Sequence, residues 1–408
     1  MSELRTRDVV DADLPAVLAI RNRSFGPLGT GGDVWWQRVS AETLGGRMIA
    51  VVDESDQVIG AGRIRPYEQA WGGQHLRMGG VAGVYVEPSA RGRGVATALT
   101  RALTTRMGEL GDVVSCLFPT TATLYRGSGY EIGGVQTRMT YAAHHLRDLG
   151  ATRAGRAGST GLRPAVPSDA QQMHDLARAS SARHGVSGPM VRSVAALTGM
   201  LERDELIAYV VDGGFVVYDL SEQAVTVEDL VATTPEAAAT LWGVVGSGSS
   251  AAPTVHTFLD PRDPVTLALG GLPTVEVQQI PWMARVVDLG AAFAGRGFGR
   301  HLSVEADLVV DDAEAPANTG RWSLSVRDGR GTATRTDDAP VRGDASTDAA
   351  DAITSNALRV EARGLAALWC GWSVSRLRQA ELATGGSPDG DAALDAVFAC
   401  QPFITEYF

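Results

Sequence analysis

The segment VYVEPSARGRGVATAL (84–99) constrains the fold more than any other part of this 408-residue chain. Val84, Tyr85 and Val86 favour a strand, which Pro88 ends, and apolar residues then recur at helical spacing. Between them two glycines alternate with two arginines, so a phosphate can approach the backbone beside the positive end of a helix dipole. The pattern predicts a strand, an anion-binding loop and a helix; an ordinary turn with solvated arginines is the alternative.

Two stretches of the chain are repeated further along. Residues 4–26 are echoed by residues 162–185, and residues 48–64 by residues 206–220, but the glycine-rich loop has no second copy. The small, turn-rich segment ATRAGRAGSTG (151–161) is predicted to be a linker between the copies. The pattern indicates a degenerate duplication that retains its chemistry only in the first half.

The remainder of the chain has a different pattern. Alternating strands (HLSVEADLVV, GRWSLSVRDG and GTATRT) are followed by predicted helices at about 348–356, 361–369 and 373–382. We therefore predict an α+β (mixed α/β) protein with three parts, namely residues 1–150, 151–285 and 286–408.

Charge and cysteine content narrow the class of protein. The net charge of −11 disfavours nucleic acid and anionic membranes as partners. Cys116, Cys370 and Cys400 lie far apart, so we expect no disulfide framework, no metal site and a reducing compartment. The charged N-terminal segment lacks the apolar core of a signal peptide, and no apolar run approaches the ~18–20 residues of a membrane span. These features predict a cytoplasmic protein.

The motif VxVxPxxRGxGVAxAL resembles the central motif of the GNAT acetyltransferases, and LYRGSGYEIGG (124–134) is similar to a downstream segment of that family. The order of the three parts resembles the Eis (enhanced intracellular survival) acetyltransferases, and the resemblance covers essentially the whole chain. It implies tandem GNAT domains, the second degenerate, followed by a domain like the sterol carrier proteins.

The resemblance also implies acetyl-CoA as co-substrate. Val84, Tyr85 and Val86 would run beside its pantetheine arm, and Thr120 and Thr121 would contact it after the next strand. Its pyrophosphate would be held by the loop and first helical turn, which comprise Arg91, Gly92, Arg93, Gly94, Val95, Ala96 and Thr97.

Acetyl transfer to an amine requires a base for the amine and an acid for the leaving thiol. Tyr125 is the candidate acid, because a phenol of pKa ~10 is protonated at neutral pH; a packing role is the alternative, and Tyr130 is assigned to the core. The resemblance implies that the C-terminal carboxylate, here that of Phe408, is the base. The aromatic rings of Phe403, Tyr407 and Phe408 would then anchor the chain end.

The resemblance to the GNAT family implies that the acceptor binds between the first helix and the next strand. Phe25, Trp35 and Trp36 lie in this part of the sequence, and the two tryptophans are as compatible with a core as with a binding surface. Asp33 and Glu406 are candidates to attract a cationic amine.

The resemblance implies an N-acetyltransferase that acts on an aminoglycoside-, polyamine- or lysine-like amine. Phe25 is followed by glycine, where family members with broad aminoglycoside activity carry an acidic residue, so the acceptor stays open. The alternatives are a protein-lysine acetyltransferase with a specific partner and a non-catalytic protein that binds an apolar ligand in its C-terminal part. Eis relatives are typically hexameric, so the resemblance implies a homo-oligomer.

Overall fold

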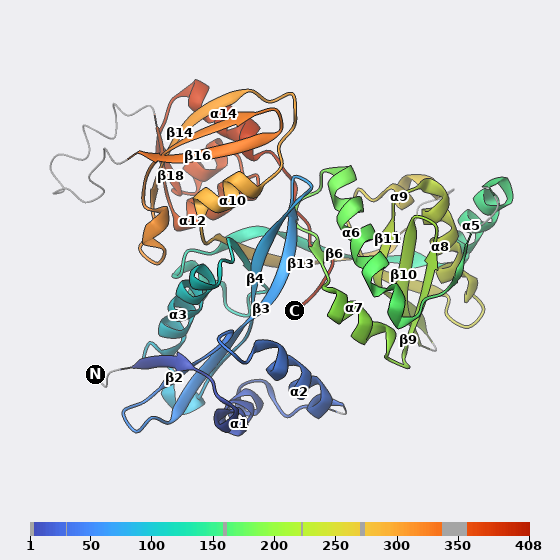
Figure 1. The fold of residues 1–408 in the computed structure, drawn as a ribbon, viewed down its shortest axis with the longest axis horizontal. Coiled ribbons are helices and arrows are strands. Elements are labelled where there is room, and N and C mark those ends of the chain that lie inside the picture. Colours follow the sequence, from blue (N-terminus) through green and yellow to red (C-terminus); the bar gives the residue numbers. More distant parts are fainter. Residues whose placement is uncertain (1–3, 30, 158–160, 222, 270–273, 337–356) are drawn as a thin grey trace.

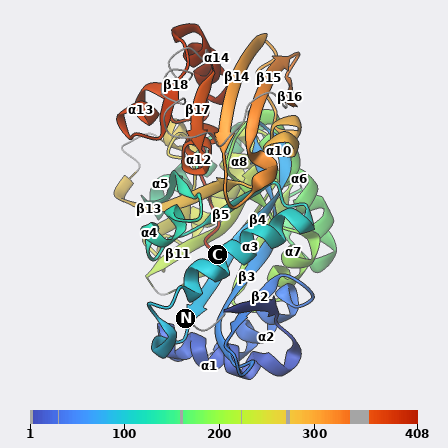
Figure 2. The same cartoon turned by 90° about the vertical axis from the view of Figure 1, so that its left-hand side faces the viewer.

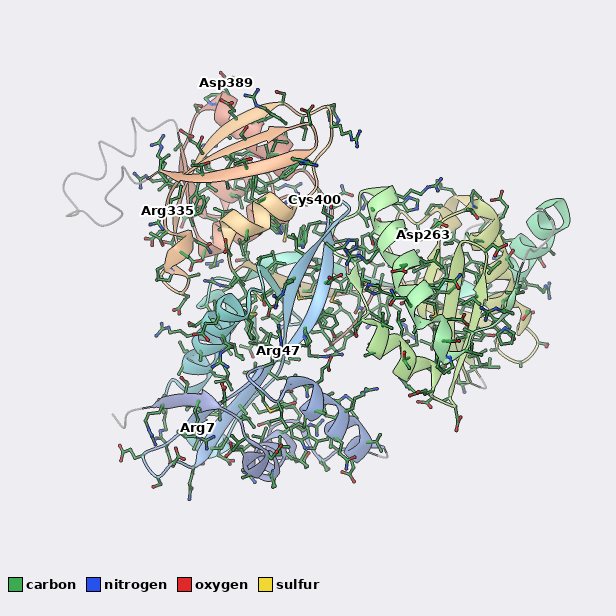
Figure 3. The ribbon with its side chains drawn as sticks, in the orientation of Figure 1. Arg7, Arg47, Asp263, Arg335, Asp389 and Cys400 are labelled. Atoms are coloured by element: carbon green, nitrogen blue, oxygen red, sulfur yellow. The ribbon has the colours of Figure 1, made fainter. Side chains whose placement is uncertain are left out.

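The computed structural model describes residues 4–29, 31–157, 161–221, 223–269, 274–336 and 357–408. An N-terminal region (4–142), a middle region (161–286) and a C-terminal region (289–408) occupy the bottom, the right and the top of Figure 1. Side chains labelled in Figure 3 mark these three regions in turn, namely Arg7 and Arg47, then Asp263, then Arg335 and Asp389.

The N-terminal region is a strongly bent sheet with helices on both faces. The strand, loop and helix predicted for residues 84–99 are confirmed, and the four apolar positions of the helix, 95, 99, 103 and 107, are all buried against the sheet. Its elements are β1 (Arg5–Asp8), α1 (Leu14–Phe25), α2 (Gly32–Thr43), β2 (Met48–Val52), β3 (Val58–Trp71), β4 (Gln74–Val86), α3 (Val95–Leu110), β5 (Val114–Leu117), α4 (Ala122–Arg126) and β6 (Glu131–Ala142).

The middle region repeats the local structure with which the N-terminal region begins. Arg7 donates two hydrogen bonds to Asp13, at 2.6 and 3.0 Å, and Arg163 donates two to Asp169, both at 2.7 Å. In each copy the aspartate also accepts the backbone N–H of the residue three positions earlier and precedes a long helix. The elements of this region are β7 (Arg163–Pro164), α6 (Ala170–His184), β8 (Met190–Val191), α7 (Val194–Leu201), β9 (Leu206–Val211), β10 (Gly214–Leu220), β11 (Ala224–Ala232), α8 (Pro235–Ser247), β12 (Thr254–Phe258), α9 (Pro264–Ala268) and β13 (Thr274–Val286).

The two regions share one thirteen-stranded sheet, in the order β1-β2-β3-β4-β5-β13-β6-β12-β11-β10-β9-β7, with β8 paired to β3. β13 of the middle region lies between β5 and β6 of the N-terminal region, and β6 lies between β13 and β12. Each region therefore contributes a strand to the other. Figure 2 shows α3 lying across this sheet.

The linker predicted at 151–161 is wrong over residues 151–157, which belong to the helix α5 (Ala143–Ala157); residues 158–160 lie outside the described part of the chain. Alanine and arginine are strong helix formers. α5 also packs on α8, where Gly150 approaches Gly243 so closely that a Cβ on Gly150 would lie 2.5 Å from the Gly243 Cα. Burial of this helix face outweighs the local turn composition.

The C-terminal region contains a five-stranded sheet in the order β16-β15-β14-β17-β18. The three predicted strands and the helices predicted at 361–369 and 373–382 are confirmed, the latter shorter at its end, and the helix predicted at 348–356 lies outside the described residues. The elements are α10 (Leu289–Gly295), β14 (Val304–Asp311), β15 (Gly320–Arg327), β16 (Arg330–Thr336), β17 (Leu358–Glu361), α12 (Ala362–Trp369), α13 (Val374–Gln379), β18 (Ala383–Gly385) and α14 (Pro388–Phe398).

A buried ion pair fastens the C-terminal region to the shared sheet. Arg285 of β13 donates to Asp312 at 2.6 Å and to the carbonyl oxygen of Ser128 at 2.7 Å, and the paired side chains are 0% and 1% exposed. Among the described helices, none has the length and apolar character needed to cross a membrane.

Substitution Asp312→Ala is expected to lower the free energy of unfolding by about 3 kcal/mol or more, because the guanidinium of Arg285 would stay buried without its counter-charge. Urea unfolding followed by fluorescence measures this loss. The matched control is Asp307→Ala, which breaks a partly exposed pair with Arg321 and should cost about 1 kcal/mol or less. Equal losses in the two variants would contradict this role of the buried pair.

Candidate active site

Strands β4 and β5 separate near the middle of the shared sheet. Their parallel pairing covers only residues 78–80 of β4 and 114–116 of β5, whereas β4 continues to Val86 with β3 on its other side. The β3–β4 ladder has a bulge at Gly83 and Val84, between the pairs Ala61–Tyr85 and Arg63–Ala82. Beyond residue 80, therefore, the backbone of β4 that faces β5 is not used by the described β4–β5 ladder.

The loop after β4 has the geometry of an anion site. Gly92 and Gly94 have φ angles of 75° and 83°, which favour glycine, and a Cβ added at either would meet nothing within 4 Å. The helix α3 begins at Val95, and the N–H groups of a first helical turn have no intrahelical partners. The loop, including Arg91 and Arg93, is exposed. A pyrophosphate would thus meet open space, free donors and the positive end of a helix dipole.

The equivalent point in the middle region has a different chemistry. After β11, Thr234 is the N-cap of α8 and its hydroxyl accepts the N–H of Ala237 at 3.1 Å. Pro235 occupies the first helical position and has no N–H to offer. The donors that would bind an anion in the first copy are therefore capped or missing in the second.

Substitution Gly94→Ala is expected to weaken acetyl-CoA binding about tenfold, because a positive φ costs a non-glycine residue roughly 1–2 kcal/mol and the new Cβ enters the space left for the anion. Isothermal titration with acetyl-CoA measures the change. The control is Gly111→Ala at the other end of α3, where φ is 75°. That variant should lose stability without losing affinity, and equal affinity losses in both would contradict the assignment of the loop.

Tyr125 lies on α4, which follows β5, and belongs to the cluster that packs with α3. Its ring meets that of Tyr130 edge to face with centroids 6.1 Å apart. Burial raises the pKa of Tyr125 to about 12, so its hydroxyl keeps its proton through the neutral range. Tyr130 is fully buried with its hydroxyl 2.8 Å from the Ser115 Oγ, which confirms its predicted place in the core.

The last ten residues (399–408), which we call the C-terminal tail, leave α14 and run between the other two regions. The N–H of Phe403 donates to the carbonyl oxygen of Ser187 at 3.1 Å, and Phe403 forms a parallel bridge with Val135 of β6. A Cβ on Gly188 would lie 2.1 Å from the Phe403 carbonyl oxygen, so only glycine fits there. Figure 1 shows the C-terminus ending at the centre of the molecule, among strands of the shared sheet.

The tail ends where β4 and β5 separate. The ring of Phe408 lies 5.2 Å from that of Tyr67 and 5.5 Å from that of Phe118, which follows β5. A Cβ on Gly80, the last residue of β4 paired to β5, would be 2.8 Å from the Phe408 ring, whereas a Cβ on Gly79 would meet Met107 of α3. Phe408 therefore lies on the face of the sheet opposite α3.

Glu406 is held by cations and a phenol. Its carboxylate lies 3.0 Å from an Arg192 nitrogen and 3.8 Å from an Arg65 nitrogen, and it accepts the hydroxyl of Tyr67 at 3.0 Å. The residue is 8% exposed. Its charge is therefore already balanced within the chain, which favours a role in anchoring the tail over direct attraction of an amine.

The residues predicted to bind the acceptor divide into two groups. Phe25 is half-exposed and packs edge to face on Tyr85 of β4, with centroids 5.6 Å apart. Trp36 is buried in the cluster between α1, α2 and the sheet, whereas Trp35 is only partly buried. Asp33 is exposed in the first turn of α2. Phe25 and Trp35 thus remain candidates for acceptor contact, while Trp36 packs in the core.

Thr120 and Thr121 are exposed directly after β5, at the same end of the parallel pair as the anion loop.

Cys116 is buried and its thiol points to the Gln69 Oε1 at 3.5 Å; burial raises its pKa to about 12, so it is a poor nucleophile. His75 lies near the start of β4, away from the bulge, and burial lowers its pKa to about 4.

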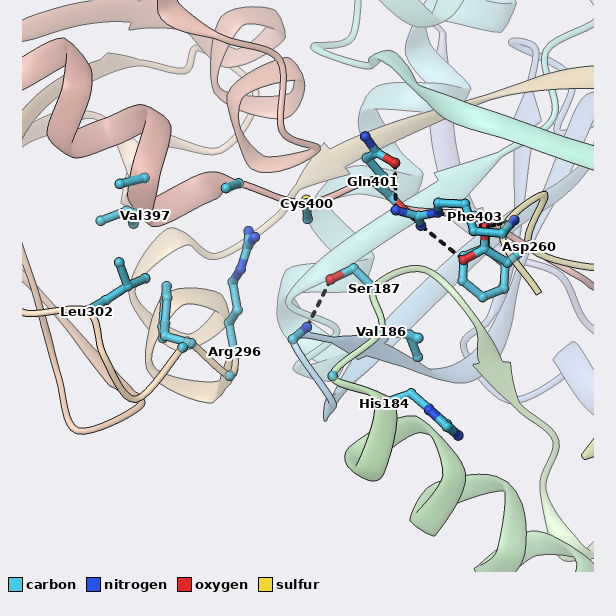
Figure 4. A pocket seen from close by; sticks show the side chains of 18 residues that line it. His184, Val186, Ser187, Asp260, Arg296, Leu302, Val397, Cys400, Gln401 and Phe403 are labelled. Atoms are coloured by element: carbon cyan, nitrogen blue, oxygen red, sulfur yellow. Dashed lines mark hydrogen bonds and ion pairs between the residues drawn. The ribbon is translucent and has the colours of Figure 1, made fainter. Parts of the chain in front are cut away.

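A cavity of about 570 Å³ opens at the junction of the three regions, away from the separated strands (Figure 4). His184, Ser187, Asp260, Arg296 and Phe403 are among its lining residues. Arg262, also at its rim, donates to the carboxylate of Asp260 and to the Gln401 side chain. The cavity borders the middle of the C-terminal tail. It therefore lies where the tail crosses the junction of the three regions.

Sequence reasoning missed the residues that receive the tail, namely Tyr67, Phe118 and Arg192. Tyr67 could have been found, because Arg63, Arg65 and Tyr67 alternate along a strand and so share one face. Arg192 had no such signal, because it comes from the other copy of the duplication.

The matches to known protein families follow the order of the three regions along the chain. Models of an acetyltransferase (GNAT) domain match residues 5–133 and 188–286, and a sterol carrier protein domain model matches residues 289–405. A comparison with curated proteins finds no match.

Among solved structures, the GCN5-related N-acetyltransferase from Kribbella flavida is 37% identical with a TM-score of 0.90, over 100% of this chain and 99% of that one. Eis1 from Mycobacterium abscessus is 20% identical with a TM-score of 0.72 over the full length of both chains, a likeness of fold. With its two GNAT domains and its sterol carrier protein-like domain, the chain belongs to the GCN5-related (GNAT) N-acetyltransferases.

Proposed function

We propose that this N-acetyltransferase transfers acetyl from acetyl-CoA directly to a primary amine, with Tyr125 as general acid and the terminal carboxylate of Phe408 as general base. The observation that carries the proposal is the position of the chain end. The ring of Phe408 packs on Gly80 and Phe118, where β4 and β5 part, on the face opposite α3. A carboxylate at this point suits a base, whereas the neighbouring carboxylate of Glu406 is already paired with Arg192 and Arg65.

The proposed roles of the residues around acetyl-CoA follow from the positions of β4, of the loop after it and of the start of α3. Acetyl-CoA supplies an activated thioester, whose pyrophosphate the loop 91–94 and the first turn of α3 would hold. Val84, Tyr85 and Val86 would line its arm along the open edge of β4, with Thr120 and Thr121 beside it. Backbone groups on that edge would polarise the carbonyl oxygen as charge develops there.

Two proton transfers complete the proposed reaction. The carboxylate of Phe408 takes a proton from the amine as its nitrogen bonds to the carbonyl carbon. Tyr125 gives a proton to the sulfur as the carbon–sulfur bond breaks, and this requires the protonated phenol that burial favours. A terminal carboxylate has an ordinary pKa of ~3.3–3.7, so desolvation by the surrounding rings or a relay water would adapt it to a neutral amine.

The experiment is a measurement of free thiol released from acetyl-CoA by the purified full chain, with a panel of aminoglycosides, polyamines and lysine peptides. Thiol release that depends on an amine, together with an acetylated amine in the mass spectrum, supports the proposal. Absence of release with every amine, combined with saturable uptake of an apolar probe, would favour a binding protein instead. Faster reaction with a specific partner protein than with small amines would identify a protein-lysine acetyltransferase.

We also propose a cytoplasmic location, from the sparse cysteines and the charged N-terminal segment, and, from the resemblance to Eis proteins, assembly into a homo-oligomer such as a hexamer. Light scattering coupled to gel filtration tests the assembly. A monomeric mass at micromolar concentration would contradict it.

A further inference from the structure

The face of β3 that lies towards α2 and the C-terminal tail carries an unusual positive charge. Arg63, Arg65 and Tyr67 share this face, whereas Ile64 between them is buried in the cluster with α3. Arg65 and Tyr67 both reach Glu406 of the tail, and Arg65 also lies 3.3 Å from Glu42. Glu42 and Glu406 are thus both within reach of Arg65, and Glu42 also attracts Arg63 electrostatically without forming an ion pair with it.

Arg63 itself is buried without a counter-ion. The residue is 6% exposed, and its Nε and Nη1 atoms are buried with no hydrogen-bond partner. Within the described residues, no carboxylate forms an ion pair with it, and burial lowers its pKa, although a guanidinium stays charged at any working pH. A buried cation without a counter-ion destabilises a fold, so stability does not explain why an arginine occupies position 63.

The contact that Arg63 makes with an aromatic ring uses none of its N–H donors. Its guanidinium lies 5.1 Å from the centroid of the Trp35 ring on α2, and that of Arg21 lies 5.9 Å from the same ring. An aromatic ring attracts the flat face of a guanidinium, while the N–H groups point outward in its plane. Those N–H groups form a planar fork that matches a carboxylate.

Along the β3–β4 ladder, Arg63 also lies close to the point where the proposed acetyl transfer would take place. It pairs across the ladder with Ala82, next to the bulge at Gly83 and Val84, and Ala61 of the same strand pairs with Tyr85. Phe25 packs on that same Tyr85. Arg63 therefore lies under the surface where the proposed reaction would receive its amine.

We propose that the acceptor carries a carboxylate that binds Arg63, so that the substrate class is an amino-acid-like amine rather than a polycation. This inference rests on the proposed function, because it concerns the acceptor of that reaction. The probes are the ω-amino carboxylates from β-alanine to 6-aminohexanoate, each compared with the alkylamine of the same chain length. Two readouts are used: thiol release from acetyl-CoA, and calorimetric binding to the full chain in the presence of CoA.

We expect at least one carboxylate to react with a kcat/KM at least tenfold above that of its alkylamine, and Arg63→Met to bring this ratio to about one. The control Arg38→Met, at an exposed position of the same helix that carries Trp35, should keep the ratio. Arg63→Met should retain its thermal unfolding midpoint, because it removes an uncompensated buried charge.

The possible outcomes distinguish the proposed acetyl transfer from the proposed carboxylate site at Arg63. Binding of a carboxylate that needs Arg63, without thiol release from any amine, would sink the transfer reaction and leave the carboxylate site standing. Equal binding and turnover of carboxylates and alkylamines would overturn the site even if transfer is rapid. A carboxylate preference that survives Arg63→Met, or a variant that merely melts earlier with its preference intact, would overturn it as well.

Discussion

Adding a single glycine after Phe408 is expected to lower kcat by ~10²-fold or more, because the carboxylate moves by one residue while every side chain stays in place. Deleting Phe408 should have a comparable effect on kcat. Acetyl-CoA affinity should not change in either variant, because the anion loop and the start of α3 lie on a separate part of the domain. Steady-state thiol release and calorimetry with acetyl-CoA measure the two quantities.

Two control variants separate the carboxylate from the rings that hold it. Tyr407→Ala removes a largely exposed ring that packs on Phe118 with centroids 4.5 Å apart, yet keeps the terminal carboxylate. Phe408→Leu also keeps the carboxylate and replaces the ring with a smaller apolar group. Both should retain most activity. If the glycine extension is as active as the unmodified chain, Phe408 is an anchor and another base must be sought.

Tyr125→Phe is expected to lower kcat by ~10²-fold, since it removes one proton donor and little volume. Because burial raises the pKa of Tyr125 to about 12, the donor is present below that pH and lost above it. The activity of the unmodified enzyme should therefore show no loss attributable to this group between pH 6 and about 10. The variant should be slower by the same factor at every pH in that range.

Tyr130→Phe is the matched control for this measurement. It removes a buried hydroxyl that contacts the Ser115 Oγ, so it should cost about 1 kcal/mol of stability with little effect on kcat. Equal kcat for Tyr125→Phe and the unmodified chain would place Tyr125 among the packing residues. A pH-dependent ratio between the two enzymes would contradict its assignment as a donor that stays protonated.

The strand, loop and helix of residues 84–99 could be predicted from the sequence because their determinants are contiguous. Gly92 and Gly94 set the backbone, and the helix that follows supplies donors and dipole. The duplication could also be predicted, and the paired motifs Arg7–Asp13 and Arg163–Asp169 explain why the two copies share residues at the same spacing. Structural features whose determining residues lie close together in the chain can be recognised from a single sequence.

Long-range pairings could not be predicted in the same way. The resemblance led us to expect that Glu406 would attract an amine, and only the fold places it against Arg65 and Arg192 from two different regions. Trp35 and Trp36 are neighbours in sequence, yet only the orientation of α2 makes Trp36 a core residue and leaves Trp35 over Arg63. The turn-rich composition of 151–157 likewise concealed a helix, because the face of α8 on which it packs lies far along the chain.

The exchange of strands between the two halves has a consequence for how the protein is made. When the ribosome has completed β6, β5 still lacks its neighbour β13, which is synthesised only after most of the middle region. The nascent N-terminal domain therefore carries an exposed strand edge, a template for wrong pairing, throughout that interval. The sheet of the N-terminal region is completed only when the middle region has been made, so the middle region is a structural component of the fold on which the candidate site depends.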